Sequence, residues 1–204
     1  MVGSECVHSD PRSPAALGLV RALGYALAMR DLKDEQLMQD YASGSMQAFE
    51  ELYTRYRLPL YRYFRRQAPD EATANDLYQG CWEKVIAARR RYRPAAPFRA
   101  WLFRIAHNHA MDFHRARKPG ASDPLEGVPD GKPGPEELLD GAAQGQRLLA
   151  ALAALPPEQK DAILLRFESG LGLEDIGKLT GVARETVKSR LRYATQKMKQ
   201  ALSK

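Results

Sequence analysis

Apolar residues recur every three or four positions along most of this chain, which is the spacing of one face of an α-helix. A clear stripe consists of Leu77, Cys81, Trp82, Val85 and Ile86. Valine, isoleucine and threonine are sparse, and no segment alternates apolar and polar residues over the length of a strand. The pattern therefore predicts an all-α fold.

A break in composition divides the helical pattern into two parts. Residues 118–145 hold five prolines, six glycines, and six acidic against two basic residues. Such a segment buries too little apolar surface to offset the entropy lost on ordering. We therefore predict a flexible acidic linker over 119–145, between small helical domains at 31–118 and 146–204. Residues 1–30 are expected to form a poorly ordered N-terminal extension, and Met29 is an alternative translation start.

The net charge of +6 is unevenly distributed along the chain. Residues 84–118 carry ten Lys or Arg and one acid, and residues 181–204 carry seven and one. Two cationic segments are typical of a protein that contacts nucleic acid at two places, although solvated helix faces are also basic. Cys6 and Cys81 alone provide no disulfide framework or zinc site, which fits a reducing cytoplasm. No segment reaches the ~18 apolar residues of a membrane helix, so no membrane insertion is expected.

Residues 173–192 have the features of a helix-turn-helix. Gly177 is a small residue where two steeply crossing helices touch, and Gly181 tolerates positive φ in the turn. Ile176, Val182 and Val187 have the spacing of the core between the helices. An ordinary helical hairpin is the alternative. In a helix-turn-helix the second helix enters the major groove of DNA. The candidate DNA-binding residues on it are Arg184, Glu185, Thr186, Lys188, Ser189 and Arg192.

Residues 97–117 interleave aromatic and basic side chains within the more cationic segment. Aromatic rings stack on unpaired bases while nearby cations hold the phosphate backbone, so this helix is suited to melted DNA. Asn108 has the chemistry to read the edge of an extruded base. The alternative is that the aromatic residues belong to the core, and Trp101 is expected to be at least partly packed. The candidate residues are Arg99, Trp101, Arg104, Asn108 and Arg115.

Three motifs in this order resemble a known family. Residues 76–85 (DLYQGCWEKV), 98–108 (FRAWLFRIAHN) and 155–160 (LPPEQK), the last followed by the helix-turn-helix, resemble regions 2 and 4 of extracytoplasmic-function (ECF) sigma factors in the sigma-70 family. The resemblance covers 31–118 and 146–204 and implies a non-enzymatic factor that directs core RNA polymerase to a promoter set. Region 2 would then melt and read the −10 element, and region 4 would read the −35 element.

The resemblance also implies partners. Asp76, Gln79 and Glu83 would contact the clamp coiled coil of the largest polymerase subunit, although Gly80, Cys81 and Trp82 depart from the usual Glu-Thr-Phe there. The acidic linker would follow the RNA-exit path. The protein would act as a monomer within the holoenzyme, in the cytoplasm. An anti-sigma factor, often membrane-tethered, would hold it inactive and could sequester it at the inner membrane.

Two other classes of protein compete with this interpretation. A helix-turn-helix regulator that acts without core polymerase would need a receiver or ligand-binding domain, and the sequence predicts no strands for one. A metal enzyme would use His107, His109 and His114, which do not share one helix face. We therefore predict no catalytic residues, no metal and no cofactor.

Overall fold

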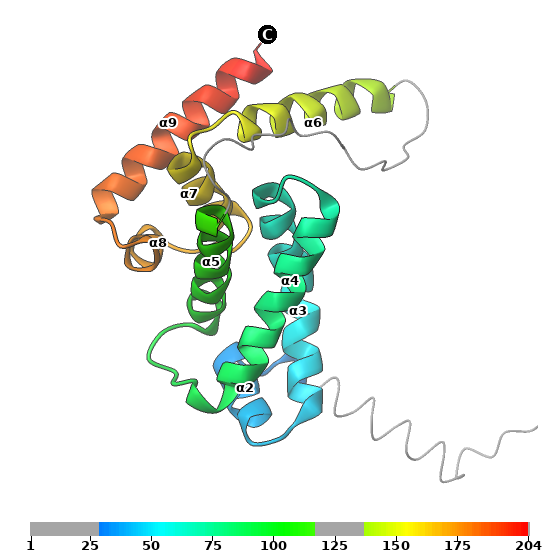
Figure 1. Ribbon diagram of the computed structural model, residues 1–204, viewed down its shortest axis with the longest axis vertical. Helices are drawn as coiled ribbons and strands as arrows, with labels where there is room; N and C mark the ends of the chain where they lie inside the picture. The colour runs from blue at the N-terminus through cyan, green and yellow to red at the C-terminus, as the bar shows by residue number, and fades with distance from the viewer. Residues whose placement is uncertain (1–28, 117–136, 204) are drawn as a thin grey trace, which may run out of the picture. The chain divides into compact units, whose positions relative to one another are not determined.

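The computed structural model describes residues 29–116 and 137–203, which form helices joined by short turns and contain no β-strand (Figure 1). The predicted all-α fold is confirmed. In chain order the helices are α2 (Asp34–Ala42), α3 (Met46–Gln67), α4 (Glu71–Ala88), the 3-10 turn η1 (Arg89–Arg91), α5 (Phe98–Ala116), α6 (Glu137–Ala153), α7 (Pro157–Phe167), α8 (Leu173–Thr180) and α9 (Arg184–Leu202).

Helix α6 begins earlier than the sequence pattern suggested. Its first residues lie within the linker predicted over 119–145. The reason is local, because α6 is rich in leucine and alanine, and these strong helix formers outweigh the two glycines within it. The linker residues 117–136, and residues 1–28 of the expected N-terminal extension, lie outside the described residues.

The chain divides into two compact units between Arg55 and Tyr56, within α3. In the first unit, Gly44 adopts a φ of 113° in the turn between α2 and α3, a conformation that favours glycine. The rings of Tyr41 and Phe49 then pack across the turn with centroids 4.7 Å apart. This contact joins the two helices.

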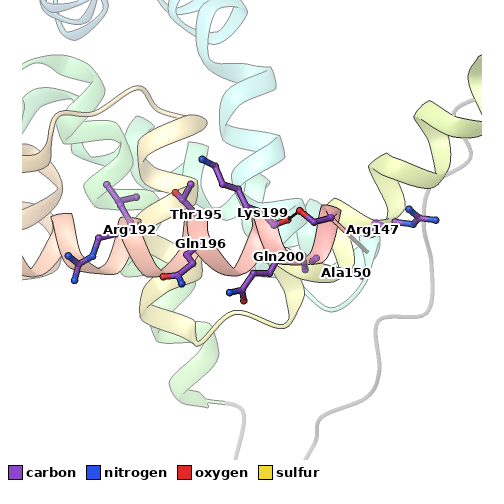
Figure 2. A pocket seen from close by; sticks show the side chains of 11 residues that line it. Arg147, Ala150, Arg192, Thr195, Gln196, Lys199 and Gln200 are labelled. Carbon is purple, nitrogen blue, oxygen red and sulfur yellow. Dashed lines mark hydrogen bonds between the residues drawn. The ribbon is translucent and has the colours of Figure 1, made fainter.

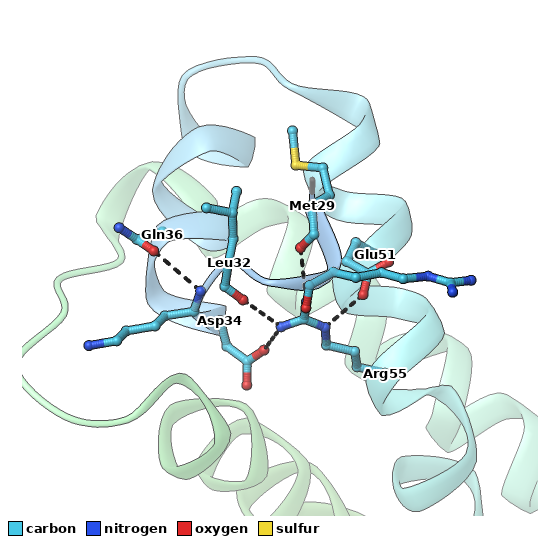
Figure 3. A network of polar contacts seen from close by, with 8 residues as sticks. Met29, Leu32, Asp34, Gln36, Glu51 and Arg55 are labelled. Carbon is cyan, nitrogen blue, oxygen red and sulfur yellow. Dashed lines mark hydrogen bonds and ion pairs between the residues drawn. The ribbon is translucent and has the colours of Figure 1, made fainter. Parts of the chain in front are cut away.

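The Arg55 side chain organises the polar side of the first unit (Figure 3). Its guanidinium donates to Glu51 at 2.8 Å, to Asp34 at 2.6 Å, and to the backbone oxygen of Leu32 at 2.9 Å. It also donates to the backbone oxygens of Met29 at 3.0 Å and Arg30 at 2.8 Å. One planar group thus anchors residues that the sequence pattern assigned to the edge of a poorly ordered extension.

Aromatic side chains dominate the core of the second unit. Tyr56 lies edge-on to Phe98 at 5.3 Å between ring centroids, and Tyr63 lies edge-on to Phe103 at 5.8 Å. Helix α4 packs along α5, and its Leu77, Cys81, Trp82 and Val85 are all buried. The apolar stripe identified in the sequence is therefore the core-facing side of α4, except at Ile86, which is 37% exposed.

Gly80 of α4 faces the His109 side chain of α5. A Cβ atom added to Gly80 would lie 2.8 Å from Nε2 of His109, which is shorter than the contacts that Cβ atoms make in proteins. Burial lowers the pKa of His109, and Lys84 adds to that effect. The departure of Gly80 from the family pattern thus has a packing reason, because His109 occupies the space that a larger residue would need.

Helices α6, α7 and α8 all pack against α9. Its Val187 and Ala194 are buried, while most of its other residues are exposed. None of the described helices is long and apolar enough to cross a membrane.

Candidate nucleic-acid interface

Helices α8 and α9 form the predicted helix-turn-helix. A Cβ atom added to Gly177 would lie 2.8 Å from the backbone oxygen of Val182, so glycine is required at this crossing. Gly181 ends α8 with a φ of 73°, and its N–H donates to the backbone oxygen of Gly177. Ile176 and Val187 are buried between the helices. The two glycines, Ile176 and Val187 therefore have the expected roles, whereas Val182, the third predicted core residue, is only half-buried.

The candidate −35 residues form the exposed face of α9. Arg184, Glu185, Thr186, Lys188 and Arg192 are exposed, and Ser189 is half-buried. Glu185 accepts a hydrogen bond from Arg184 at 3.0 Å and lies 3.6 Å from Lys188 Nζ. These exposed pairs contribute little to stability and can be exchanged for contacts with phosphate or bases.

A wide groove between α6 and α9 extends this cationic face (Figure 2). Its volume is about 1390 Å³, and its lining contains three cations, Arg147, Arg192 and Lys199, with no acidic side chain. Gln196 and Gln200 provide amide groups on the same side of α9. The surface of α9 is thus favourable to anions well beyond the turn.

The candidate −10 residues divide into exposed and packed groups on α5. Arg104, Asn108 and Arg115 are exposed, and Arg115 pairs with Asp112 at 2.9 Å. Trp101 is half-buried, as expected for a partly packed ring, with its centroid 5.1 Å from that of Tyr92.

Some of the α5 side chains face inward. The neighbouring Phe98 and Phe103 are fully buried. These two rings are therefore core residues and are not available to stack on bases. Arg99 is exposed, and its guanidinium carbon lies 5.9 Å from the ring centroid of Tyr56.

Asp76, Gln79 and Glu83 share the exposed face of α4, opposite its buried stripe. Their spacing of three and four residues keeps them on one side of the helix. Cys81 faces the core, and burial raises the pKa of its thiol to about 12. The sulfur therefore lies away from the surface that carries the three candidate polymerase contacts.

An apolar groove among α6, α7 and α9 was not anticipated from the sequence. It has a volume of about 340 Å³, and Phe167 at its edge is 73% exposed. Phe167 shares helical spacing with Ile163 and Leu164, and spacing alone does not tell a core ring from an exposed one. Its apolar lining residues are Leu148, Leu149, Leu152, Ile163, Leu164, Phe167, Met198 and Leu202.

The described residues contain no group of three His, Cys, Asp or Glu side chains that could hold a metal ion. His107, His109 and His114 do not converge there. His107 lies beside Asp161, and His109 packs 6.2 Å from Phe64 between ring centroids.

Comparisons with known proteins match both halves of the chain. The family model for Sigma-70 region 2 matches residues 52–119, and that for Sigma-70, region 4 matches residues 151–200. The chain is 33% identical over 159 residues to the ECF RNA polymerase sigma factor SigL of Mycobacterium tuberculosis, covering 74% of this chain and 86% of the relative. It is 32% identical over 164 residues to the ECF RNA polymerase sigma factor SigE of Mycolicibacterium smegmatis, covering 78% of this chain and 63% of that relative.

A solved structure has the same fold. The complex of the sigma factor RpoE with the anti-sigma factor NepR from Bartonella quintana has a chain that superposes with a TM-score of 0.65 at 24% identity. The match covers 78% of this chain and 98% of the other.

Proposed function

The chain belongs to the ECF sigma factors of the sigma-70 family, which direct RNA polymerase to specific promoters. On that basis we propose which helix contacts each promoter element and which contacts core polymerase. A sigma factor is a polymerase subunit and not itself an enzyme. The domains proposed for this work are region 2 at 31–118 and region 4 at 146–204, joined by the acidic segment 119–145.

Helix α9 reads the −35 element in the major groove. The observation that carries this assignment is the pair Gly177 and Gly181, whose close approach and positive φ fix α9 across α8. The exposed arginines Arg184 and Arg192 have the geometry for bidentate contacts to guanine, while Lys188 suits phosphate. Glu185, Thr186 and Ser189 add shorter polar contacts.

Helix α5 binds the −10 element as it melts. Arg104, Asn108 and Arg115 are exposed along it and provide hydrogen bonds to phosphate and to an extruded base. Trp101 presents the accessible part of its ring for stacking, and Arg99 adds a cation at the start of the helix.

Helix α4 docks on core polymerase through Asp76, Gln79 and Glu83. Support comes from their shared exposed face and from the rigidity of α4, whose opposite side is buried. Reversal of charge in Asp76→Lys should weaken core binding, whereas Glu50→Lys, the same reversal at an exposed residue of α3, should have a smaller effect. Co-elution with core polymerase measures both.

An anti-sigma protein regulates the chain in the cytoplasm, where core polymerase works, and could hold it at the inner membrane. The apolar groove around Phe167 supports such a partner, because an amphipathic helix buries its apolar side in a groove of this kind. The structural relative RpoE is seen in complex with an anti-sigma factor.

The assignments are tested together by in vitro transcription with purified core polymerase on a pool of promoter fragments. Specific transcripts should appear only when the protein is added. Arg192→Ala should reduce them, and base changes in the mapped −35 element should have the same effect. Arg57→Ala, which removes an exposed arginine on α3 outside both candidate DNA-binding surfaces, is the matched control. An operator bound tightly without polymerase, together with no transcripts, would favour the helix-turn-helix regulator instead.

A further inference from the structure

Asp161 of α7 is the centre of a buried polar cluster that joins three helices. It is 5% exposed. Tyr63 of α3 donates its hydroxyl to Asp161 Oδ1 at 2.8 Å, and Gln67 of α3 donates its amide to the same oxygen at 3.0 Å. His107 of α5 places Nδ1 3.0 Å from Asp161 Oδ2. Oδ1 therefore accepts two hydrogen bonds from side chains far away in the sequence, and Oδ2 lies within ion-pair distance of a third.

The cluster links the two halves that the family models separate. Tyr63, Gln67 and His107 fall within the region 2 match, and Asp161 falls within the region 4 match. Burial raises the pKa of Tyr63 well above its ordinary value, and the charge of Asp161 adds to that effect. Tyr63 therefore stays protonated and serves as a donor to the carboxylate.

Two further contacts join the same halves. Arg66 of α3 forms an ion pair with Glu168, just after α7. A guanidinium nitrogen of Arg99 lies 3.0 Å from the position of a Cβ atom added to Gly170. Since Arg99 lies eight residues before His107, both occupy one side of α5. Residues of the region 4 match, which carries the candidate −35 helix, thus partly cover α5, the candidate −10 helix.

This arrangement does not fit a promoter-bound state. Elements centred near −10 and −35 are separated by about 25 base pairs, or about 85 Å at ~3.4 Å per base pair. A direct hydrogen bond between α3 and α7 is too short-ranged to persist while the two halves reach sites so far apart. Every group in the cluster is polar and can be hydrated when the halves separate, so the contact can open reversibly.

We propose that the Asp161 cluster is an autoinhibitory latch, which holds regions 2 and 4 together in the free chain and must open before both can reach a promoter. The proposal rests on the assignment of α5 and α9 to the two promoter elements. Loss of one hydrogen bond to a charged group shifts a closed-to-open equilibrium about 10- to 100-fold towards the open state.

The test is energy transfer between dyes on the free, full-length protein. In a Cys6→Ser background, Arg57→Cys on α3 and Gln200→Cys on α9 provide exposed labelling sites away from the proposed polymerase-docking face of α4, and the remaining native Cys81 is buried. The latch predicts high transfer in this background and low transfer after core polymerase binds. Asp161→Ala and Tyr63→Phe should lower the transfer of the free chain, whereas Asp40→Ala, at an exposed aspartate on α2, should not.

Charge reversal tests the interface independently of the buried cluster. Arg66→Glu should lower the transfer, and the double variant Arg66→Glu with Glu168→Arg should restore it. Circular dichroism verifies that each variant remains helical. Unchanged transfer in helical Asp161→Ala and Arg66→Glu variants, or low transfer before any substitution, would overturn the proposal. Transcription assays test the promoter assignments separately, so their failure would leave the transfer result standing.

Discussion

Gly177→Ala should destabilise the helix-turn-helix, even though alanine is the better helix former. Alanine in place of glycine within a helix contributes about 1 kcal/mol of stability. Here the added Cβ would lie 2.8 Å from the backbone oxygen of Val182, and backbone cannot rotate away as a side chain can. Overpacking of this kind costs about 1–3 kcal/mol.

The clash should outweigh the gain in propensity, because relief of it requires α8 to move away from the turn. That movement would stretch two hydrogen bonds to the Gly177 oxygen, one from Gly181 and one from Val182 at 3.0 Å. The net loss should be up to about 2 kcal/mol, and each kcal/mol lost should lower the melting temperature by roughly 2–4 °C in a compact unit of this size.

Thermal and urea unfolding followed by circular dichroism measure the effect. Gly145→Ala is the matched control, since nothing lies within 4 Å of its added Cβ in α6, and it should stabilise the protein by up to about 1 kcal/mol. Equal stabilisation by both substitutions would refute the reasoning, since it would mean that the crossing has room for a methyl group.

Other substitutions test contacts elsewhere. Arg55→Ala should cost about 2 kcal/mol of unfolding free energy after allowance for partial exposure, and Arg55→Lys should recover only part of this, because lysine lacks the planar fork. Gly80→Ala should stabilise a His109→Ala variant by about 1 kcal/mol and the native protein by less, because the half-buried His109 ring must first rotate away from the added methyl group; a double-mutant cycle measures the difference. In a Cys6→Ser variant, Cys81 should react with a thiol reagent at pH 8 only as fast as the protein unfolds, because its buried thiol has a pKa of about 12. Fast reaction under native conditions would contradict that burial.

Local features of the sequence determined the helices and much of the candidate DNA-binding surface. Helical spacing separated the buried stripe of α4 from its exposed face, and glycine chemistry located the turn between α8 and α9. These inferences succeeded because periodicity and positive φ are properties of neighbouring residues. The residue at which the linker ends was not predicted correctly. The leucines and alanines of α6 extend the helix into a segment whose average composition is that of a loop.

Only the tertiary structure decided which polar residues meet. Tyr63 and Asp161 are 98 positions apart, and nothing in the position of either residue on its own helix indicates the other as its partner. The same holds for the Arg55 donations to Asp34 and to the backbone of residues 29, 30 and 32, and for Gly80, which faces a histidine on another helix. Contacts of this kind depend on how helices pack, and the spacing of residues along one helix specifies its own faces but not the partner that each face will find.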